Sequence, residues 1–333
     1  MTKSYKLLFL STLIMGTLIA ISSYSWLSMW IGLEINLLSM IPLLSNQSNL
    51  YPSEAALKYF ITQALASTIL LFSIISTINI SEFFPNQNIL FMMIFNSALL
   101  TKMGAAPFHA WFPEVMEGLN WPNCLIMLTW QKIAPMTIIL YFPYMTFFLS
   151  MVVVFSSTIG GVMGLNQTSL RKILAYSSIN HIGWMIASML NSQYIWLTYF
   201  IIYSVITANI VIIFLETNTY FFKQMFETLN QNKMMKFFFF LNFFSLGGLP
   251  PFLGFYPKWL TINNLVENNF LTLSLILIVS TLVTLFFYLR MTFSAMTINP
   301  QETLIWIPKM KVFLIILSNF FSLTGLIVCT LVL

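Results

Sequence analysis

The sequence predicts an all-α membrane protein that crosses the bilayer about eleven times. Hydrophobic residues make up 59% of the 333 positions and charged residues only 7%, whereas a soluble domain carries about 25% charged residues. The apolar residues fall in runs of about 20, which is the length that crosses the hydrocarbon core as a helix. Only a helix satisfies its own backbone hydrogen bonds within such a run, so each run is predicted to be helical.

Eleven apolar runs are bounded by turn residues such as Pro, Asn and Ser. They lie at about 5–22, 25–44, 54–76, 89–111, 123–142, 147–164, 172–190, 194–216, 236–266, 270–293 and 312–333. The polar stretches near 217–235 and 294–311 are predicted to be surface loops. No connection is long enough for a soluble domain, so residues 1–333 are expected to form one membrane domain.

The basic residues support this count through the positive-inside rule. Eleven of the fourteen lysines and arginines fall in connections on the N-terminal side of the predicted topology. They are Lys3, Lys6, Lys58, Arg171, Lys172, Lys223, Lys233, Lys236, Arg290, Lys309 and Lys311. The remaining three lie inside apolar runs. The N-terminus is therefore predicted to face the compartment of synthesis, and the C-terminus the opposite side.

The fourth and ninth runs are interrupted by helix-breaking residues. The fourth contains Gly104 and Pro107, and the ninth contains Gly248, Pro250 and Pro251. The two runs lie five spans apart, and an odd offset means that they enter the membrane from opposite faces. Paired broken helices of this kind are typical of inverted repeats around a transport site. We therefore predict two inverted five-helix repeats, over 5–142 and 147–293, and an additional C-terminal helix over 312–333.

Glu34, Lys102, Lys132 and Lys258 are charged residues that lie inside apolar runs, away from the ends of those runs. A charge at the centre of a bilayer costs at least about 2.5–3.5 kcal/mol, and such residues usually line an ion pathway. Glu34 and Lys102 are candidates for a pair that switches between a charged, contacting state and a separated state in which the lysine releases its proton. For Glu34 the alternatives are a structural ion pair or a hydrogen bond between helices. For Lys132 the alternative is snorkelling, although Lys132 lies near the middle of its span.

His181 is the counterpart of Glu34 if the two repeats are aligned by their helices. Imidazole titrates near neutral pH, so His181 is a candidate proton relay, with a hydrogen-bonded packing histidine as the alternative. His109 follows the first interruption directly and is expected to be structural.

Several classes of function find no support in the sequence. No basic cluster is interleaved with aromatic residues as nucleic-acid binding requires. Cys124 and Cys329 lie in apolar runs and form neither a disulfide framework nor a metal motif. No Arg-rich transit peptide is found. No glycine-rich phosphate loop or haem-type histidine pair is found either, so we expect no cofactor and no bound metal in this chain.

Six segments of the sequence resemble the antiporter-like membrane-arm subunits of respiratory complex I, in their shortened animal form. The segments are Trp30-Ile-Gly-Leu-Glu34-Ile-Asn36, Lys102-Met-Gly-Ala-Ala-Pro107-Phe-His109-Ala-Trp111-Phe-Pro-Glu114, Trp130-Gln-Lys132-Ile-Ala-Pro135, Leu165 to Ser178, His181-Ile-Gly-Trp184 and Leu246 to Trp259. The segments occur in order, and the resemblance covers essentially the whole chain.

The resemblance implies a proton channel lined by a Glu–Lys pair, a central lysine and a lysine on the second broken helix. Glu34, Lys102, Lys132 and Lys258 fall on those positions. It also implies that NADH, FMN, iron–sulfur clusters and ubiquinone are bound by partner subunits. The expected partners are other membrane-arm and accessory subunits and membrane lipids, with cardiolipin as a candidate. The expected location is the mitochondrial inner membrane, with the N-terminus in the matrix.

Two other functions remain open at this point. A subunit of a cation/proton antiporter would share the fold and the buried lysines. A structural scaffold that retains an old transporter fold would hold neighbouring subunits together without pumping.

Overall fold

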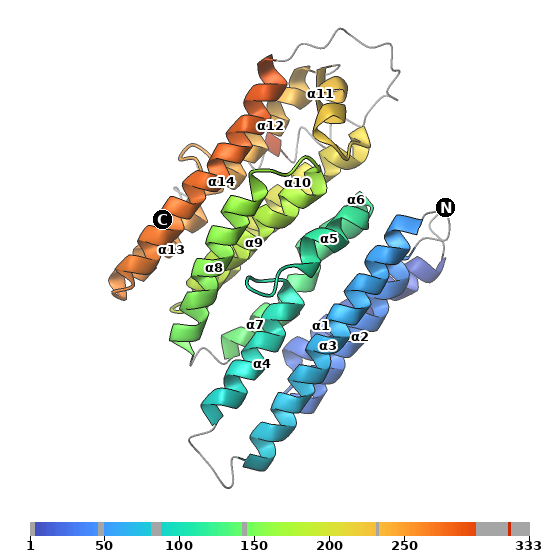
Figure 1. Ribbon diagram of the computed structural model, residues 1–333, viewed down its shortest axis with the longest axis vertical. Coiled ribbons are helices and arrows are strands. Elements are labelled where there is room, and N and C mark those ends of the chain that lie inside the picture. Colours follow the sequence, from blue (N-terminus) through green and yellow to red (C-terminus); the bar gives the residue numbers. More distant parts are fainter. Residues whose placement is uncertain are drawn as a thin grey trace. The chain divides into compact units, whose positions relative to one another are not determined.

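The computed structural model describes residues 4–45, 50–80, 88–141, 145–230, 233–297 and 319–320. Within these ranges the regular structure is helical (Figure 1), apart from one antiparallel bridge between Ser169 and Phe221. The chain divides into two compact units, residues 1–152 and 153–333. The C-terminal run predicted at 312–333 lies outside the described residues, except for 319–320.

The first unit contains α1 to α7 and the start of α8. The bounds are α1 (Ser4–Ser22), α2 (Trp26–Leu44), α3 (Leu50–Ile80), α4 (Asn88–Met103), α5 (Trp111–Gly118), α6 (Trp121–Leu128), α7 (Trp130–Tyr141) and α8 (Thr146–Gly164). The second unit contains the rest. Its helices are α9 (Leu170–Met189), α10 (Gln193–Thr217), α11 (Phe222–Asn230), α12 (Lys233–Gly247), α13 (Phe255–Glu267) and α14 (Leu271–Thr297).

Seven helical segments within the described ranges are long and apolar enough to cross a membrane. They are α1, α2, most of α3, α6 with α7, α8, α10 and α14. The predicted fold class of an all-helical membrane protein is therefore confirmed. The run predicted at 236–266 is divided into α12, which ends at Gly247, and α13. In the run predicted at 89–111 the helix α4 ends early, at Met103, and the next helix begins only at Trp111.

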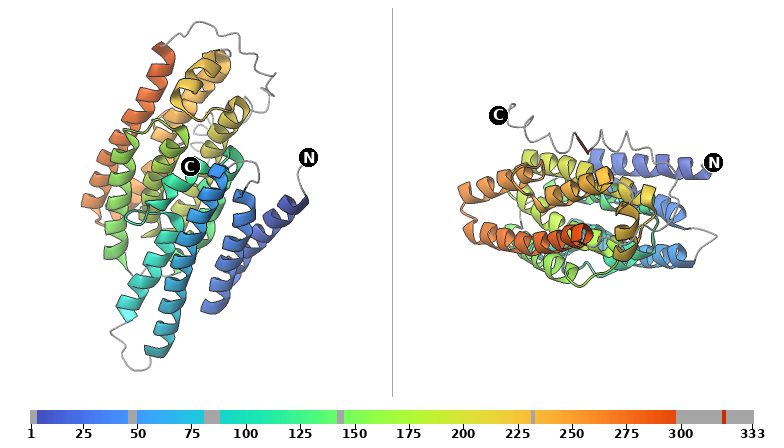
Figure 2. Two further views of the ribbon diagram at one scale, coloured as in Figure 1. Left: turned by 45° about the vertical axis from the view of Figure 1, so that its right-hand side comes forward. Right: turned by 90° about the horizontal axis from the view of Figure 1, so that it is seen from above.

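Helices α1 and α2 pack closely against each other (Figure 2), and small residues lie where they meet. A methyl group built on Gly32 would lie 2.6 Å from the backbone nitrogen of Ala20, and one built on Gly16 would lie 2.9 Å from the nitrogen of Asn36. In lipid, helices gain little from apolar burial against one another, so close backbone approach supplies the packing energy. This contact fixes the part of α2 that carries Glu34.

Helix α9 is the most enclosed helix of the second unit, and 18 of its 20 residues are buried. It contacts α10, α13 and α14. Because protein surrounds it, α9 can hold polar residues such as Asn180 and His181 that a lipid-facing helix would exclude. This is the physical reason that α9 is not one of the seven apolar segments, although the run at 172–190 was predicted as a span.

Two local features differ from the sequence-based expectations. The run at 123–142 is interrupted at Thr129, whose φ of −115° and ψ of −70° separate α6 from α7. The prediction of a surface loop was wrong for residues 222–230, which form α11. Its Met225 is buried, whereas Lys223 is exposed. The Gln224 side chain accepts hydrogen bonds from the backbone N–H groups of Tyr220 and Phe221, at 3.0 and 3.3 Å, and so supports the start of the helix.

Candidate functional site

The first interruption, residues 104–110, begins with a glycine-terminated helix end. Gly104 has a φ of +74°, a backbone conformation that favours glycine. The N–H of Gly104 donates to the carbonyl of Thr101 at 3.1 Å, and the N–H of Ala105 donates to that of Leu100 at 3.0 Å. This pair of bonds is a Schellman motif, which satisfies the last carbonyls of α4. Lys102 lies in the final turn of that helix.

Lys102 and Glu34 lie within electrostatic reach of each other but do not form a direct ion pair. Lys102 is 7% exposed, and the charge of Glu34 acts on it. The two side chains, both described, form no N–O contact within 4.0 Å. The Oε1 atom of Glu34 is buried and has no hydrogen-bond partner in the described part of the chain. The structure therefore brings the predicted pair into one region and leaves the two charges separated.

Amide side chains connect the helices that carry these charges. The Gln63 amide of α3 donates to the backbone carbonyl of Lys102 at 3.3 Å. The Gln131 amide of α7 donates to the Asn36 side chain of α2 at 2.9 Å. Asn36 lies two residues after Glu34, so the hydrogen bond holds α7 against the part of α2 that carries the carboxylate.

Lys132 is almost fully enclosed, at 1% exposed, and lies in the first turn of α7. Its ammonium is 5.7 Å from the centroid of the Phe112 ring, which is within the range of a cation–π contact. The break at Thr129 and the proline at 135 flank it, so the regular helical hydrogen bonds are incomplete on both sides. The alternative that Lys132 snorkels to the membrane surface is not supported by this burial.

The second interruption, residues 248–254, begins with the same motif as the first. Gly248 has a φ of +76°, and its N–H donates to the carbonyl of Ser245 at 3.0 Å. The N–H of Leu249 donates to the carbonyl of Phe244 at 3.3 Å. Two helices in different units thus end in the same Schellman geometry.

Lys258 folds back from α13 onto the end of α12. Its ammonium donates hydrogen bonds to the carbonyls of Leu246, at 3.2 Å, and Gly247, at 2.9 Å. The same group lies 5.8 Å from the centroid of the Trp184 ring, and the residue is 6% exposed. The C-terminal end of a helix carries partial negative charge, so these carbonyls stabilise the protonated ammonium.

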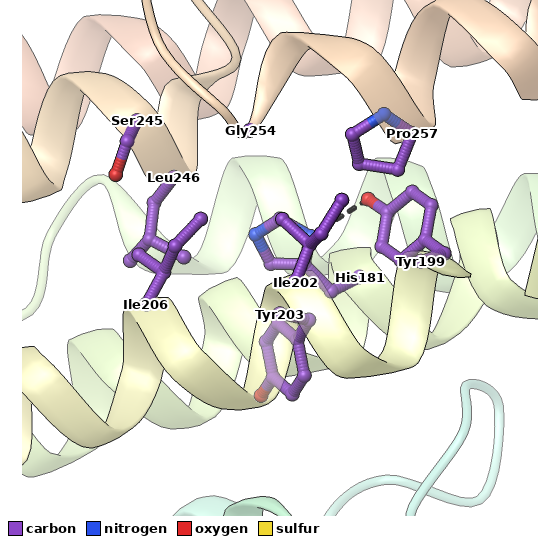
Figure 3. Close-up of a pocket in the computed structure, with 9 residues that line it drawn as sticks. All are labelled: His181, Tyr199, Ile202, Tyr203, Ile206, Ser245, Leu246, Gly254 and Pro257. Carbon is purple, nitrogen blue, oxygen red and sulfur yellow. Dashed lines mark hydrogen bonds between the residues drawn. The ribbon is translucent and has the colours of Figure 1, made fainter. Parts of the chain in front are cut away.

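His181 lies in the second unit beside two tyrosines of α10. Its Nδ1 atom is 2.9 Å from the hydroxyl of Tyr199, and its ring centroid is 5.0 Å from that of Tyr203. A cavity of about 10 Å³, the space of about one water molecule, adjoins the three side chains (Figure 3). Leu246 and Pro257 also line it, so the cavity reaches the turn that holds the Lys258 ammonium.

The two interruptions correspond residue by residue, which the sequence reasoning missed. In both, Gly-x-x-Pro-Phe is followed by a helix that begins seven residues after the glycine, at Trp111 and at Phe255. In this alignment Lys258 matches Glu114, and Lys102 matches Leu246. The shared Gly-x-x-Pro-Phe pattern could have revealed the match. The two lysines therefore occupy different positions in the repeated pattern.

Glu114, the residue that matches Lys258, has a different environment. It pairs with Lys58 at 2.8 Å, and both side chains are more than half exposed.

No group of three or more His, Cys, Asp or Glu side chains within the described ranges could hold a metal ion. The prediction that cofactors are bound only by other subunits is not tested by this observation and stays a prediction.

Comparison with known proteins identifies the family of the chain. Residues 23–284 match the model of the NADH:quinone oxidoreductase/Mrp antiporter membrane family. The chain is 49% identical to NADH-ubiquinone oxidoreductase chain 2 of Anopheles gambiae over 98% of this chain and 97% of the relative. It is 50% identical to the protein of the same name from Aedes aegypti, with the same shares covered.

A solved structure shows the same fold at much lower sequence identity. A chain of respiratory complex I from Thermus thermophilus superposes with a TM-score of 0.87 and 23% identity, covering 97% of this chain and 78% of that chain. At this identity the likeness is evidence of the fold alone. Because the family match and the sequence relatives span nearly the whole chain, the chain belongs to the NADH-ubiquinone oxidoreductase chain 2 family, within the NADH:quinone oxidoreductase/Mrp antiporter membrane proteins.

Proposed function

We propose that the chain is a proton-translocating membrane-arm subunit of respiratory NADH:ubiquinone oxidoreductase. The observation that carries the proposal is the burial of three lysines, Lys102, Lys132 and Lys258, each at 7% exposure or less and each beside a helix break. Proton transfer needs buried groups that exist in two protonation states, and it needs mobile backbone that can change their surroundings. The family to which the chain belongs supplies the respiratory context.

The relay begins at Glu34 and Lys102. Their charges interact without direct contact, and we interpret this arrangement as the separated state of the proposed switch. If the end of α4 moves toward α2, contact stabilises both charges; if it moves away, the lysine loses that stabilisation and releases its proton. Since Lys102 lies two residues before Gly104, the first interruption supplies the moving part.

The energy of such a rearrangement is adequate for the task. Two unit charges 4 Å apart attract by about 4 kcal/mol at an effective dielectric constant of about 20. Moving one charge against a membrane potential of about 100 mV costs about 2.3 kcal/mol. Forming or breaking one Glu–Lys contact therefore covers the cost of moving one proton.

Lys132, Lys258 and His181 complete the proposed relay. Lys132 accepts the proton released in the first unit, and Lys258 delivers it onward with His181 and a water in the adjoining cavity. Protons load from the matrix side and leave to the intermembrane space, and redox chemistry in other subunits drives the movement. The chain itself makes and breaks no covalent bond to substrate, so its part in the enzyme is translocation.

The remaining parts of the proposal concern topology and surroundings. We infer eleven spans in two inverted five-helix repeats, because the two interruptions share one local geometry and lie an odd number of spans apart. The distribution of basic residues supports an N-terminus in the matrix and a C-terminus in the intermembrane space. The setting is the mitochondrial inner membrane, with other membrane-arm and accessory subunits and lipids, cardiolipin among the candidates, around the chain.

The test is a Lys102→Ala substitution in the assembled complex. Proton pumping and NADH-driven ubiquinone reduction are measured in proteoliposomes and compared with Lys58→Met, which removes an exposed lysine. The proposal requires Lys102→Ala to lose most of its pumping and Lys58→Met to keep it. Wild-type pumping and ubiquinone reduction by Lys102→Ala would refute the pair as a switch.

The cation/proton antiporter is the second candidate, because the matching family model also covers Mrp antiporters. Sodium- or potassium-dependent proton movement in the absence of NADH would identify it. A non-pumping scaffold is the third candidate. It predicts that charge-neutral substitutions at Glu34, Lys102, Lys132 and Lys258 alter the amount of assembled complex and leave the pumping of each assembled complex unchanged.

A further inference from the structure

We propose that Gly248 is a positioning residue for Lys258: the absence of a side chain at 248 lets the lysine ammonium reach the last carbonyls of α12. The inference rests on the proposed function, in which Lys258 carries a proton, and it adds the element that sets where that proton is held.

The first step is the path of the Lys258 side chain. The residue belongs to the first turn of α13, yet its ammonium hydrogen-bonds the carbonyls of Leu246 and Gly247 at the end of α12. To reach them, the aliphatic part of the side chain passes directly over Gly248. A methyl group built on Gly248 would lie 2.7 Å from Lys258 Cδ, 3.1 Å from Cε and 3.0 Å from Nζ.

The second step separates two reasons for glycine at this position. The φ of +76° favours glycine whatever surrounds it. Gly104 shares this reason, with a φ of +74° and the same two Schellman hydrogen bonds. The space for a lysine is a separate reason that Gly104 lacks, because a methyl group there would meet the Cβ and ring carbons of Phe112 at 3.0–3.4 Å.

The third step is the effect of the carbonyls on the lysine. They lie at the negative end of α12, and their hydrogen bonds to the protonated amine are stronger than those to the neutral amine because the ammonium carries the charge that the helix end attracts. An added methyl group forces the flexible end of Lys258 away, so the protonated form loses acceptors within the protein. As the pH rises, Lys258 then loses its proton at a lower pH than in the wild type. Pumping that depends on the protonated lysine is therefore lost at that lower pH.

Other titratable groups near Lys258 must be distinguished from it. The helices packed against α13 contribute His181 from α9, Tyr199 and Tyr203 from α10, and Tyr288 from α14. Of these, only the histidine has a reference pKa near neutral. A His181→Gln background therefore shows whether a shift in the pH profile arises from the histidine.

The experiment compares Gly248→Ala with Gly104→Ala in the assembled complex. Both variants place alanine at a positive φ, so their common loss of stability serves as an internal reference, measured as the melting temperature. NADH-driven proton pumping in proteoliposomes is then recorded across a range of pH. We expect Gly248→Ala to pump about tenfold or more slowly than the wild type, because an ångström-scale displacement of a reacting group can cost up to about 100-fold.

The pH profile is the reading that a merely structural role would not change. We expect the alkaline limb of Gly248→Ala to move to lower pH than that of the wild type by about half a unit or more, in the wild-type and the His181→Gln backgrounds. An alkaline limb of Gly248→Ala that coincides with that of the wild type would overturn the inference. So would a shift of Gly248→Ala that disappears in the His181→Gln background.

Two further variants keep the test decisive. If the alanine variants fail to assemble, Gly248→Asn and Gly104→Asn replace them, because asparagine tolerates positive φ while its Cβ still meets the same neighbours. Lys258→Met distinguishes this inference from the proposed function. Normal pumping by Lys258→Met contradicts the relay itself, whereas loss of pumping by Lys258→Met with normal pumping by the Gly248 variants contradicts only the positioning role.

Discussion

Replacing Lys258 with methionine is the sharpest test of whether this lysine serves transport or stability. Methionine has a similar length and an unbranched, adaptable side chain, so it can occupy the space over Gly248 without a cavity. The substitution removes the two hydrogen bonds at 2.9 and 3.2 Å to the carbonyls of Gly247 and Leu246. It also removes a charge from a site that is 6% exposed.

The two effects on stability have opposite signs. Hydrogen bonds to a charged group contribute about 1.5–3 kcal/mol each, so losing both costs about 3–6 kcal/mol. Burying an ammonium costs several kcal/mol, and that cost is no longer incurred once the charge is removed. We therefore expect a net change in stability of no more than about 2 kcal/mol in either direction, together with loss of pumping.

The assay measures three quantities on one preparation: the amount of assembled complex, its melting temperature and its NADH-driven proton pumping in sealed proteoliposomes. Lys58→Met is the matched control, because it removes a lysine whose side chain is 53% exposed. Normal assembly with lost pumping supports a transport role for Lys258. Strong destabilisation would show that the lysine is a structural cap, and wild-type pumping would refute the reasoning altogether.

Two further substitutions test the surroundings of the relay. Tyr199→Phe removes the hydroxyl that lies 2.9 Å from His181 Nδ1. Because such a hydrogen bond contributes about 1 kcal/mol, we expect pumping to slow by less than about tenfold. The control is Tyr194→Phe, at an exposed tyrosine, which leaves the rate unchanged. Gly32→Ala would place a methyl group 2.6 Å from the Ala20 nitrogen, which is backbone and cannot rotate away, so overpacking should cost about 1–3 kcal/mol. A melting temperature equal to that of Gly161→Ala, where the nearest atom is 3.4 Å away, would contradict this packing argument.

Much of the fold could be predicted because the length and apolar composition of each run are enough to predict a membrane-spanning helix. The apolar runs at 5–22, 25–44 and 194–216 agree closely with α1, α2 and α10, since a lipid-facing helix needs only length and apolar side chains. Helix α11 was missed because its stability comes from Met225 packing inward and from the Gln224 side chain at its start. Neither contact produces a long apolar run.

The candidate residues were identified from the sequence for the same reason. Charged side chains in apolar runs are costly, and Lys102, Lys132 and Lys258 are indeed buried. Their partners could not be read from the sequence. Direct pairing of Lys102 with Glu34 depends on how α2 and α4 pack, and the structure leaves the two charges apart.

The sequence by itself determined the membrane class, most of the helical runs, the two glycine–proline interruptions and the buried ionisable residues, because these properties depend on local composition and spacing. The tertiary structure decided what each group contacts. It placed the Lys258 ammonium on the carbonyls of α12 and the His181 ring beside Tyr199. Such contacts join residues from different helices, and they depend on the relative positions of those helices, which no single run encodes.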